Sequence, residues 1–249
     1  MRTKKSAANP PRSRDGSLAR IAAAIPRCAL CPRLRRHCAE VAASKRRAFR
    51  DWTYWGRPVP GFGDPHARLW IIGLAPAAHG ANRTGRMFTG DSSGDWLFRA
   101  LHAHGFAHQP GSVARDDGQR LEDAFLSAAV RCAPPDNRPT TGEIDRCAPW
   151  LERERQALES VRVVVALGQI AFRASLRLLQ DAGYHVPRPQ PRFGHLACTT
   201  LDGGGNDPII LLASYHPSRQ NTQTGRLTRP MFDAVFAAVR RILTPTPTR

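Results

Sequence analysis

Four short apolar runs divide the chain, and turn residues flank each of them. They are RLWIIGLA near residues 68–75, DAFLSAAV near 123–130, VRVVVAL near 161–167 and PIILLAS near 208–214. Helical patterns lie between and after them, over residues 94–105, 142–159, 168–181 and 229–243. Near-continuous apolar strands that alternate with helices predict a parallel sheet covered on both faces. We therefore expect a three-layer α/β fold with a short central, mostly parallel four-stranded sheet flanked by helices.

The N-terminal segment follows a different pattern. Residues 1–16 are rich in Pro, Ser, Lys and Arg with almost nothing to bury, which predicts a disordered basic tail. A helix is expected from about Ser17, and the stretch PRLRRHCAEVAASKRRAF predicts a basic amphipathic helix after Pro32. The Gly- and Pro-rich stretch YWGRPVPGFGDP predicts a loop. With 249 residues in total, one domain over residues 17–249 is the expectation.

The net charge is +17, and the N-terminal part carries most of it. Residues 1–50 hold fourteen Lys or Arg and two Asp or Glu, a net +12. A basic arm of this kind is common in proteins that bind polyanions, although a solvated tail has the same composition. No apolar run approaches the roughly 20 residues of a membrane span, and the start lacks a secretory signal. We expect a cytoplasmic protein with no membrane partner; an organelle transit peptide is the alternative for the Arg- and Ser-bearing start.

Six cysteines occur in a chain without an export signal, so thiols, metal ligands or catalytic groups are expected instead of disulfides. Cys28 and Cys31 form a C-x2-C pair, and fourteen residues separate Cys132 from Cys147. Such a set can enclose a tetrahedral zinc ion or a [4Fe–4S] cluster. A zinc ribbon would normally show two C-x2-C pairs, which this chain lacks. The two other cysteines fall outside the pattern.

Polar and glycine-rich loops follow all four predicted strands. Functional loops gather at the carboxyl ends of strands in such sheets, so these loops should meet at one edge. The first carries GLAPAAHGANRTGRMFTGD and the last carries HPSRQNTQTGRLT, while VRCAPPDNRPT follows the second strand. Together with the cysteines, these motifs resemble family 5 of the uracil-DNA glycosylase superfamily, the type B enzymes. The resemblance covers roughly residues 18–243.

The resemblance implies an enzyme that flips a base out of DNA and hydrolyses its N-glycosidic bond. Phe88 matches the family's aromatic that stacks on the base, a contact worth about 1–3 kcal/mol. The backbone of Gly73 and Ala75 would line the base pocket. A core anchor for the long loop is the structural alternative for Phe88. The family's four ligands of a [4Fe–4S] cluster match Cys28, Cys31, Cys132 and Cys147.

Two further positions match catalytic groups of the superfamily. His216 matches the histidine that stabilises the leaving base anion. Other families carry a carboxylate just after the first glycine of the motif, where this chain has Leu74 and Ala75. In family 5 an aspartate later in the loop is implicated, and Asp91 matches it. The alternative role for Asp91 is the N-cap of the helix that follows.

Specificity and DNA contacts come from neighbouring positions. Uracil-specific relatives carry an Asn in the second strand where alignment on the cysteine places Ala128, so we expect a pocket that also admits hypoxanthine and xanthine. Asn137 is a polar candidate at the pocket mouth, or a turn residue. The last loop has no acid and should contact DNA; its candidate residues for phosphate contacts and for the wedge that fills the vacated stack are Arg219, Gln220, Asn221 and Arg226.

These observations predict a monomeric, monofunctional DNA-repair glycosylase that acts on double- and single-stranded DNA and leaves an abasic site. The missing motif carboxylate keeps open a non-catalytic iron–sulfur or zinc protein that binds DNA. A third reading is an α/β enzyme of free mononucleotides, but the +17 charge and the Arg-containing last loop speak against it.

Overall fold

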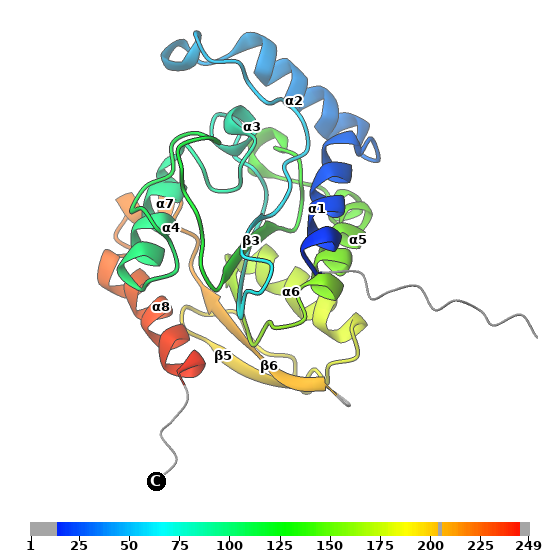
Figure 1. Ribbon diagram of the computed structural model, residues 1–249, viewed down its shortest axis with the longest axis vertical. Helices are drawn as coiled ribbons and strands as arrows, with labels where there is room; N and C mark the ends of the chain where they lie inside the picture. Colours follow the sequence, from blue (N-terminus) through cyan, green and yellow to red (C-terminus); the bar gives the residue numbers. More distant parts are fainter. Residues whose placement is uncertain (1–13, 204–205, 245–249) are drawn as a thin grey trace, which may run out of the picture.

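A mixed sheet forms the centre of the computed structural model, which describes residues 14–203 and 206–244 (Figure 1). In that part of the chain the sheet has six strands in the order β1-β3-β2-β4-β6-β5. Their bounds are β1 Phe62–Gly63, β2 Leu69–Gly73, β3 Ala124–Ala128, β4 Val163–Leu167, β5 Cys198–Gly203 and β6 Asn206–Ser214. The four predicted strands are β2, β3, β4 and β6. All neighbouring pairs among them are parallel, which confirms the predicted sheet.

The two outer strands were not predicted, and both run antiparallel to their neighbours. Strand β1 has only two residues, inside the Gly- and Pro-rich stretch expected to be loop. Strand β5 alternates exposed residues with buried or half-buried ones and forms a hairpin with β6. Neither strand has the continuous apolar run that marks a strand buried on both faces, so the apolar pattern missed them. The sheet is therefore mixed, with a parallel centre.

Helices cover both faces of the sheet and make it the middle of three layers. On one face, α4 (Ser92–Ala103) and α8 (Arg229–Leu243) pack with Leu69 and Ile71 of β2. On the other, α1 (Arg14–Ala24), α5 (Thr141–Ala157) and α6 (Gln169–Asp181) pack with Trp70 and Ile72. The alternating side chains of one strand thus enter two different cores. None of the helices in the described ranges is long and apolar enough to cross a membrane.

Capping residues set the helix boundaries close to the predicted ones. Asp91, Thr140 and Thr228 cap α4, α5 and α8, and each side chain accepts a hydrogen bond from the first turn of its helix. Thr140 and Glu143 form a reciprocal capping box. The remaining helices are α2 (Pro32–Ser44) and the short α3 (Ala81–Thr84) and α7 (Arg219–Gln223), with 3₁₀ turns η1 Ile25–Arg27, η2 Arg47–Phe49 and η3 Pro135–Asn137.

The first helix begins earlier than expected. The structure starts α1 at Arg14 and not at Ser17, so residues 14–16 of the predicted disordered tail are helical. Residues 1–13 of that tail lie outside the described residues. The boundary was wrong because the Arg, Asp and Gly that open the helix carry no apolar pattern, and apolar periodicity was the only guide to its start.

Candidate active site

The parallel strands define where a ligand should sit. The loop after β2 leads to α4 on one face of the sheet, whereas Gly168 after β4 leads to α6 on the other. Because β2 and β4 are neighbours, their carboxyl ends enclose a topological switch point, the usual ligand crevice of an open α/β sheet. Gly73 ends β2, and a side chain at Gly168 would contact His216. The predicted catalytic loops therefore meet at this crevice.

Phe88 lies directly against the end of β2. A Cβ atom on Gly73 would come within 2.5 Å of the Phe88 ring, so only glycine leaves room for the ring here. Phe88 itself has φ 53°, a left-handed backbone conformation that is uncommon for a bulky residue. Its ring is half-buried, with part of its surface accessible. The loop thus places one aromatic face at the crevice and pays for that position in backbone strain.

His216 lies beside Phe88, in the loop after β6. The two ring centroids are 6.4 Å apart and their planes are inclined by 30°. Burial lowers the pKa of His216 to about 4, so the imidazole is neutral at physiological pH. Neither ring nitrogen makes a hydrogen bond within the described part of the chain, whereas its backbone carbonyl accepts hydrogen bonds from Asn221 Nδ2 at 2.8 Å and Ser218 N at 2.8 Å. The backbone is fixed and the ring is free to bind a ligand.

Asp91 fills one of the two roles that the sequence left open, the N-cap of α4, and its catalytic role stays a prediction. Its Oδ1 accepts hydrogen bonds from Ser93 N at 2.9 Å and Gly94 N at 3.0 Å, which makes it the N-cap of α4. Its Oδ2 makes no hydrogen bond within the described residues and lies against Gly80, where a Cβ would collide with it. Burial raises the pKa of Asp91 although both backbone hydrogen bonds act in the opposite sense. One carboxylate oxygen therefore holds the helix, and the other can bind a water molecule.

The remaining predicted pocket residues lie in different places. Ala75 is half-buried and packs against the core that contains the cysteines. Ala128 ends β3, pairs with Gly73 and is buried. Asn137 is exposed in the turn η3 with φ 55°, and the structure records no side-chain contact between it and the loop after β2. The turn interpretation fits the geometry of Asn137, and a pocket role stays a prediction.

The loop after His216 is mostly exposed. Arg219 and Gln220 lie on the surface in α7, and Arg226 lies over the Tyr215 ring with its guanidinium carbon 4.8 Å from the ring centroid. Asn221 differs from them, because its side chain binds the His216 carbonyl and its backbone carbonyl accepts from Leu227. Arg219, Gln220 and Arg226 are exposed, and their contact with DNA stays a prediction, whereas the Asn221 side chain holds the His216 carbonyl.

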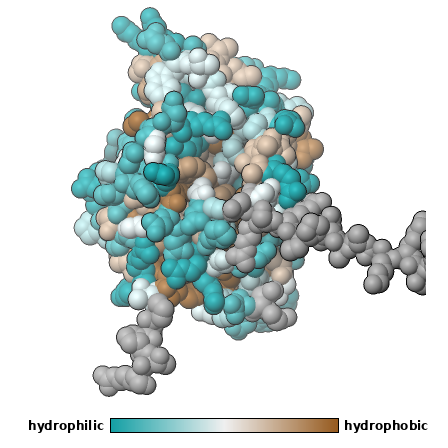
Figure 2. Space-filling model, viewed as in Figure 1, coloured by the Kyte–Doolittle hydropathy of each residue, from teal (hydrophilic) through white to brown (hydrophobic). Residues whose placement is uncertain are grey.

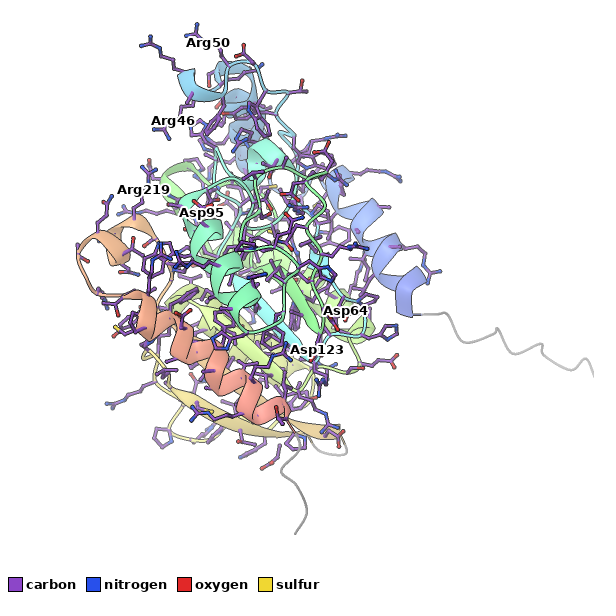
Figure 3. All side chains as sticks on the ribbon, turned by 60° about the vertical axis from the view of Figure 1, so that its left-hand side comes forward. Arg46, Arg50, Asp64, Asp95, Asp123 and Arg219 are labelled. Carbon is purple, nitrogen blue, oxygen red and sulfur yellow. The ribbon has the colours of Figure 1, made fainter. Side chains whose placement is uncertain are left out.

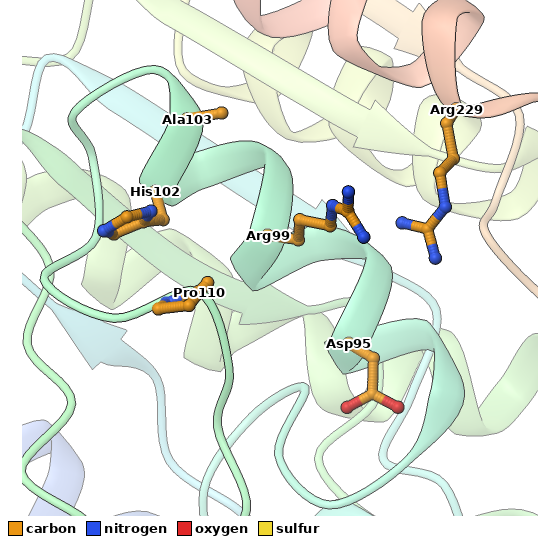
Figure 4. Close-up of a pocket in the computed structure, with 6 residues that line it drawn as sticks. All are labelled: Asp95, Arg99, His102, Ala103, Pro110 and Arg229. Carbon is orange, nitrogen blue, oxygen red and sulfur yellow. The ribbon is translucent and has the colours of Figure 1, made fainter.

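An open hollow lies beside this site. It has a volume of about 550 Å³ and opens on the outer face of α4 (Figure 4). Its lining comes from α4, the loop before β3 and the start of α8: Asp95, Arg99, His102, Ala103, Pro110 and Arg229. The sequence pattern did not single out these residues, because charges on the outer face of an amphipathic helix are ordinary. The hollow is lined by none of the predicted pocket residues.

The four predicted cluster ligands come from three separate parts of the chain. Cys28 and Cys31 lie between η1 and α2, Cys132 follows β3 and Cys147 lies in α5. Burial, opposed by Arg131 and helped by the nearby Cys28 and Cys31 thiols, raises the pKa of Cys147 to about 11. Cys31, Cys132 and Cys147 share one small apolar core. The fold thus brings the four predicted thiols into one neighbourhood, which we call the cysteine site.

The surroundings of the cysteine site suit an anionic group larger than one ion. Arg35 Nη1 and Arg131 Nε and Nη1 are buried without a hydrogen-bond partner in the described residues, and both side chains act electrostatically on these thiols. No group of three or more ligating side chains there is close enough to hold a single metal ion. Thiolates around one zinc ion would lie within about 4 Å of each other. Arg131 Nη2 is already paired with Glu154 at 2.6 Å, so the free donors are single guanidinium nitrogens and not whole groups. The donor set and these nitrogens fit an iron–sulfur cluster, whose four thiolates carry negative charge.

Sequence reasoning missed two residues that matter here. Cys38 is buried beside Cys132, and its thiol donates to the Ala133 carbonyl at 3.7 Å. Arg83 is almost fully buried inside the loop after β2 and donates to the Gly90 carbonyl at 2.8 Å. No spacing rule in the sequence points to Cys38 or Arg83, because their contacts appear only once the chain is folded.

Comparison with known proteins identifies the family of this chain. Residues 60–240 match the family model of the uracil DNA glycosylase superfamily. That range begins just before β1 and ends in α8, so it contains the sheet and all the residues of the crevice. The chain belongs to this superfamily.

The curated relatives narrow the class. A type-5 uracil-DNA glycosylase of Mycobacterium tuberculosis is 50% identical over 228 residues, which cover 91% of this chain and 82% of the relative. One of Thermus thermophilus is 53% identical over 215 residues, covering 86% of this chain and 93% of the relative. A type-4 enzyme of Pyrobaculum aerophilum is 32% identical over only 51% of this chain. The chain is therefore a type-5 member and a glycosylase, a hydrolase of N-glycosyl bonds.

Proposed function

We propose that this protein excises uracil and deaminated purines, hypoxanthine and xanthine, from DNA and leaves an abasic site. The observation that carries the proposal is that Phe88 lies against the end of β2 and beside His216, which follows β6, while Asp91 lies later in the loop of Phe88. A base inside a duplex is out of reach, so the target nucleotide must rotate out of the helix into this crevice. There the accessible face of Phe88 stacks on the base.

The neutral His216 stabilises the leaving base. As the N-glycosidic bond breaks, its electron pair moves onto the base and negative charge develops on the base oxygen. A ring N–H of His216 donates a hydrogen bond to that oxygen. Its pKa of about 4 makes it a neutral donor, and a preorganised donor in a water-poor site contributes strongly to the rate. Because the Asn221 and Ser218 bonds fix the His216 carbonyl, the ring is held ready for this task.

Asp91 positions the nucleophile. Its Oδ2 is available while Oδ1 caps α4, so the free oxygen can orient a water molecule towards the anomeric carbon of the sugar. The water oxygen bonds to that carbon, the base departs with the electron pair of the old bond, and Asp91 receives a proton. The ionised carboxylate also stabilises the positive charge that grows on the sugar.

The small residue at Ala128 supports a broad substrate range. Ala128 lies beside Gly73 at the end of β3, and its methyl group cannot form hydrogen bonds to the edge of a base. A pocket that reads a base edge by hydrogen bonds rejects bases that leave those groups unpaired. Without such an amide at Ala128, uracil and deaminated purines compete on shape and stacking.

We further propose that Cys28, Cys31, Cys132 and Cys147 hold a [4Fe–4S] cluster. When bound, the cluster would supply Fe–S bonds that link α2, the segment after β3 and α5. The support is the cysteine site itself, with its shared core and the unpaired guanidinium nitrogens of Arg35 and Arg131.

The cluster proposal has a direct test. The purified protein should be brown and contain iron, and Cys147→Ala should lose the colour and lower the melting temperature. Cys198→Ala is the matched control, because Cys198 is exposed and distant in the fold on β5. Zinc in place of iron, or equal stability of the two variants, would refute the proposal.

The substrate proposal is tested with matched oligonucleotides that contain uracil, hypoxanthine or xanthine, in single and double strands, followed by hot alkali. We expect cleavage at uracil and at one or more deaminated purines. Strict uracil specificity would refute the argument from Ala128. Binding without any excision would favour the alternative of a non-catalytic DNA-binding protein.

A further inference from the structure

Residues 45–57 form an exposed, strongly basic segment between α2 and β1, which we call the basic segment. Arg46, Arg47, Arg50 and Arg57 are all exposed, and Asp51 is the one acid among these thirteen residues. None of the salt bridges within the described residues involves the segment. Figure 3 shows Arg46 and Arg50 pointing away from the body at its upper end, with Arg219 lower along the same edge. Figure 2 shows hydrophilic side chains projecting from this end.

Backbone hydrogen bonds attach the basic segment to the loop after β2. Trp55 N donates to the Arg83 carbonyl at 2.9 Å, and Gly56 N donates to the Asn82 carbonyl at 3.0 Å. A Cβ on Gly85 would collide with the Trp55 ring, so this ring packs closely on the backbone of the loop after β2. These contacts join the segment to the loop that carries Phe88. A surface held this firmly keeps a fixed position relative to the base crevice.

Arg83 makes the connection tighter. Its guanidinium carbon lies 3.9 Å from the centroid of the Phe49 ring and 4.1 Å from that of Trp52. The same group donates to the Gly90 carbonyl at 2.8 Å, one residue before Asp91. The buried Arg83 therefore ties the aromatic side chains of the basic segment to the turn that places Asp91.

We propose that the basic segment is a second DNA-contact surface, which binds phosphates of the duplex that flanks the flipped nucleotide. This inference rests on the proposed function. The loop after β6 would contact the strand on one side of the lesion, and the basic segment, held by the loop after β2, would contact DNA on the other. In the sheet, β4 lies between β2 and β6, so the basic segment and the loop after β6 flank the crevice.

The chemistry of the segment fits a phosphate backbone. Arginine binds phosphate through two parallel N–H groups, and exposed guanidinium groups without acidic partners are available for such bonds. The duplex carries one negative charge per about 1.7 Å of its axis, so a rigid group of cations meets several phosphates at once. An acidic protein partner is the competing occupant, and the experiment below distinguishes it.

The test uses two double variants of the full chain with the same change in net charge. Arg46→Ala/Arg50→Ala removes cations from the basic segment. Arg120→Ala/Arg241→Ala is the control, since both residues are exposed, and they precede β3 and end α8, away from the carboxyl ends of the strands. Binding to an abasic-site duplex is measured from 50 to 300 mM salt. Single-turnover excision of uracil is measured at saturating enzyme.

We expect the test variant to lose about 1–2 units of salt slope, at about 0.9 per phosphate contact, and roughly tenfold or more in affinity. The control should keep the parent slope, and both variants should excise uracil at the parent rate once saturated. Equal slopes for test variant and control would overturn the inference and favour an acidic partner. Excision by the parent enzyme decides the proposed function separately, because the slope is measured on binding alone.

Discussion

Two loops border the proposed base crevice, and they are built in opposite ways. In the loop after β2, most residues from Ala81 to Thr89 are buried, including the charged Arg83 and Arg86. Arg86 forms a buried ion pair with Asp117 at 2.6 Å. In residues 217–229 after β6, most side chains are exposed, and Leu227 anchors the loop in the core. One loop is packed like an interior, and the other lies on the surface.

The difference follows from the work that each loop would perform. A wall that must hold a ring in the strained conformation of Phe88 needs surroundings that fix it from several sides. A segment that enters a duplex must offer free polar groups and can be held at its ends alone. Substitutions should therefore act through geometry in the first loop and through direct DNA contacts in the second.

The largest effect is expected at His216, where the second loop begins. His216→Ala should lower the single-turnover excision rate by about 10²–10³, the usual result of losing one preorganised donor to an oxyanion. Binding to abasic DNA should largely survive. A rate within threefold of the parent would remove His216 from the proposed mechanism and leave it a structural residue.

Two glycines compare the loops directly. Gly73→Ala should slow excision by roughly 10–100-fold, because the new Cβ displaces Phe88 and small displacements have large effects on rate. A Cβ at Gly225 would meet no atom within 4 Å, but the φ of 72° is strained for alanine. Gly225→Ala should therefore lower the free energy of unfolding by about 1 kcal/mol. Thermal unfolding and single-turnover rates of both variants check this. Equal effects on rate would contradict the difference between the loops.

A smaller, selective effect is expected at Gln220 in the exposed loop. If this side chain fills the stack that the flipped base vacates, Gln220→Ala should impair excision from duplex DNA several-fold. Single-stranded substrates need no unpairing and should react as before. The ratio of the two rates is the measurement, and an unchanged ratio would show that Gln220 is not the wedge.

The smallest effect concerns a single phosphate contact. Arg226 lies over the Tyr215 ring and is exposed, so its guanidinium group can bind a phosphate of a DNA strand. Arg226→Ala should weaken binding to all sequences and reduce the salt slope by about 0.9. A sequence-dependent loss of affinity, or an unchanged slope, would show that the residue has another role.

The sequence predicted the parts of the fold that have a periodic pattern. The parallel strands and the four long helices after β2 were located within a few residues, because buried strands and amphipathic helices repeat at fixed intervals. Strands β1 and β5 were not predicted, since edge strands that are short or half-exposed lack such a pattern. The start of α1 was misplaced for the same reason.

The candidate site was predictable in its residue types but not in its contacts. The motifs placed Phe88, Asp91 and His216 in loops that meet at one edge of the sheet. They could not show that Oδ1 of Asp91 caps α4 or that Asn221 holds the His216 carbonyl. Such facts depend on side-chain geometry between segments, which spacing in a sequence does not encode.

The most direct test of the account is the Asp91→Asn variant, with single-turnover excision measured against pH and thermal unfolding measured alongside. Asn keeps a cap oxygen and removes a buried charge, so the melting temperature should be unchanged or higher. Thr228→Ala, which removes the cap of α8, is the control and should lower stability by about 1 kcal/mol without affecting the rate.

The parent enzyme should gain activity as pH rises through the pKa of Asp91, which burial places above the ordinary aspartate range. His216 has a pKa lowered by burial to about 4 and is therefore neutral at physiological pH. Asp91→Asn should be slower at every pH and should lose this acidic limb. A variant that retains the parent rate and pH profile but melts at a lower temperature would contradict the account and leave Asp91 as a helix cap alone.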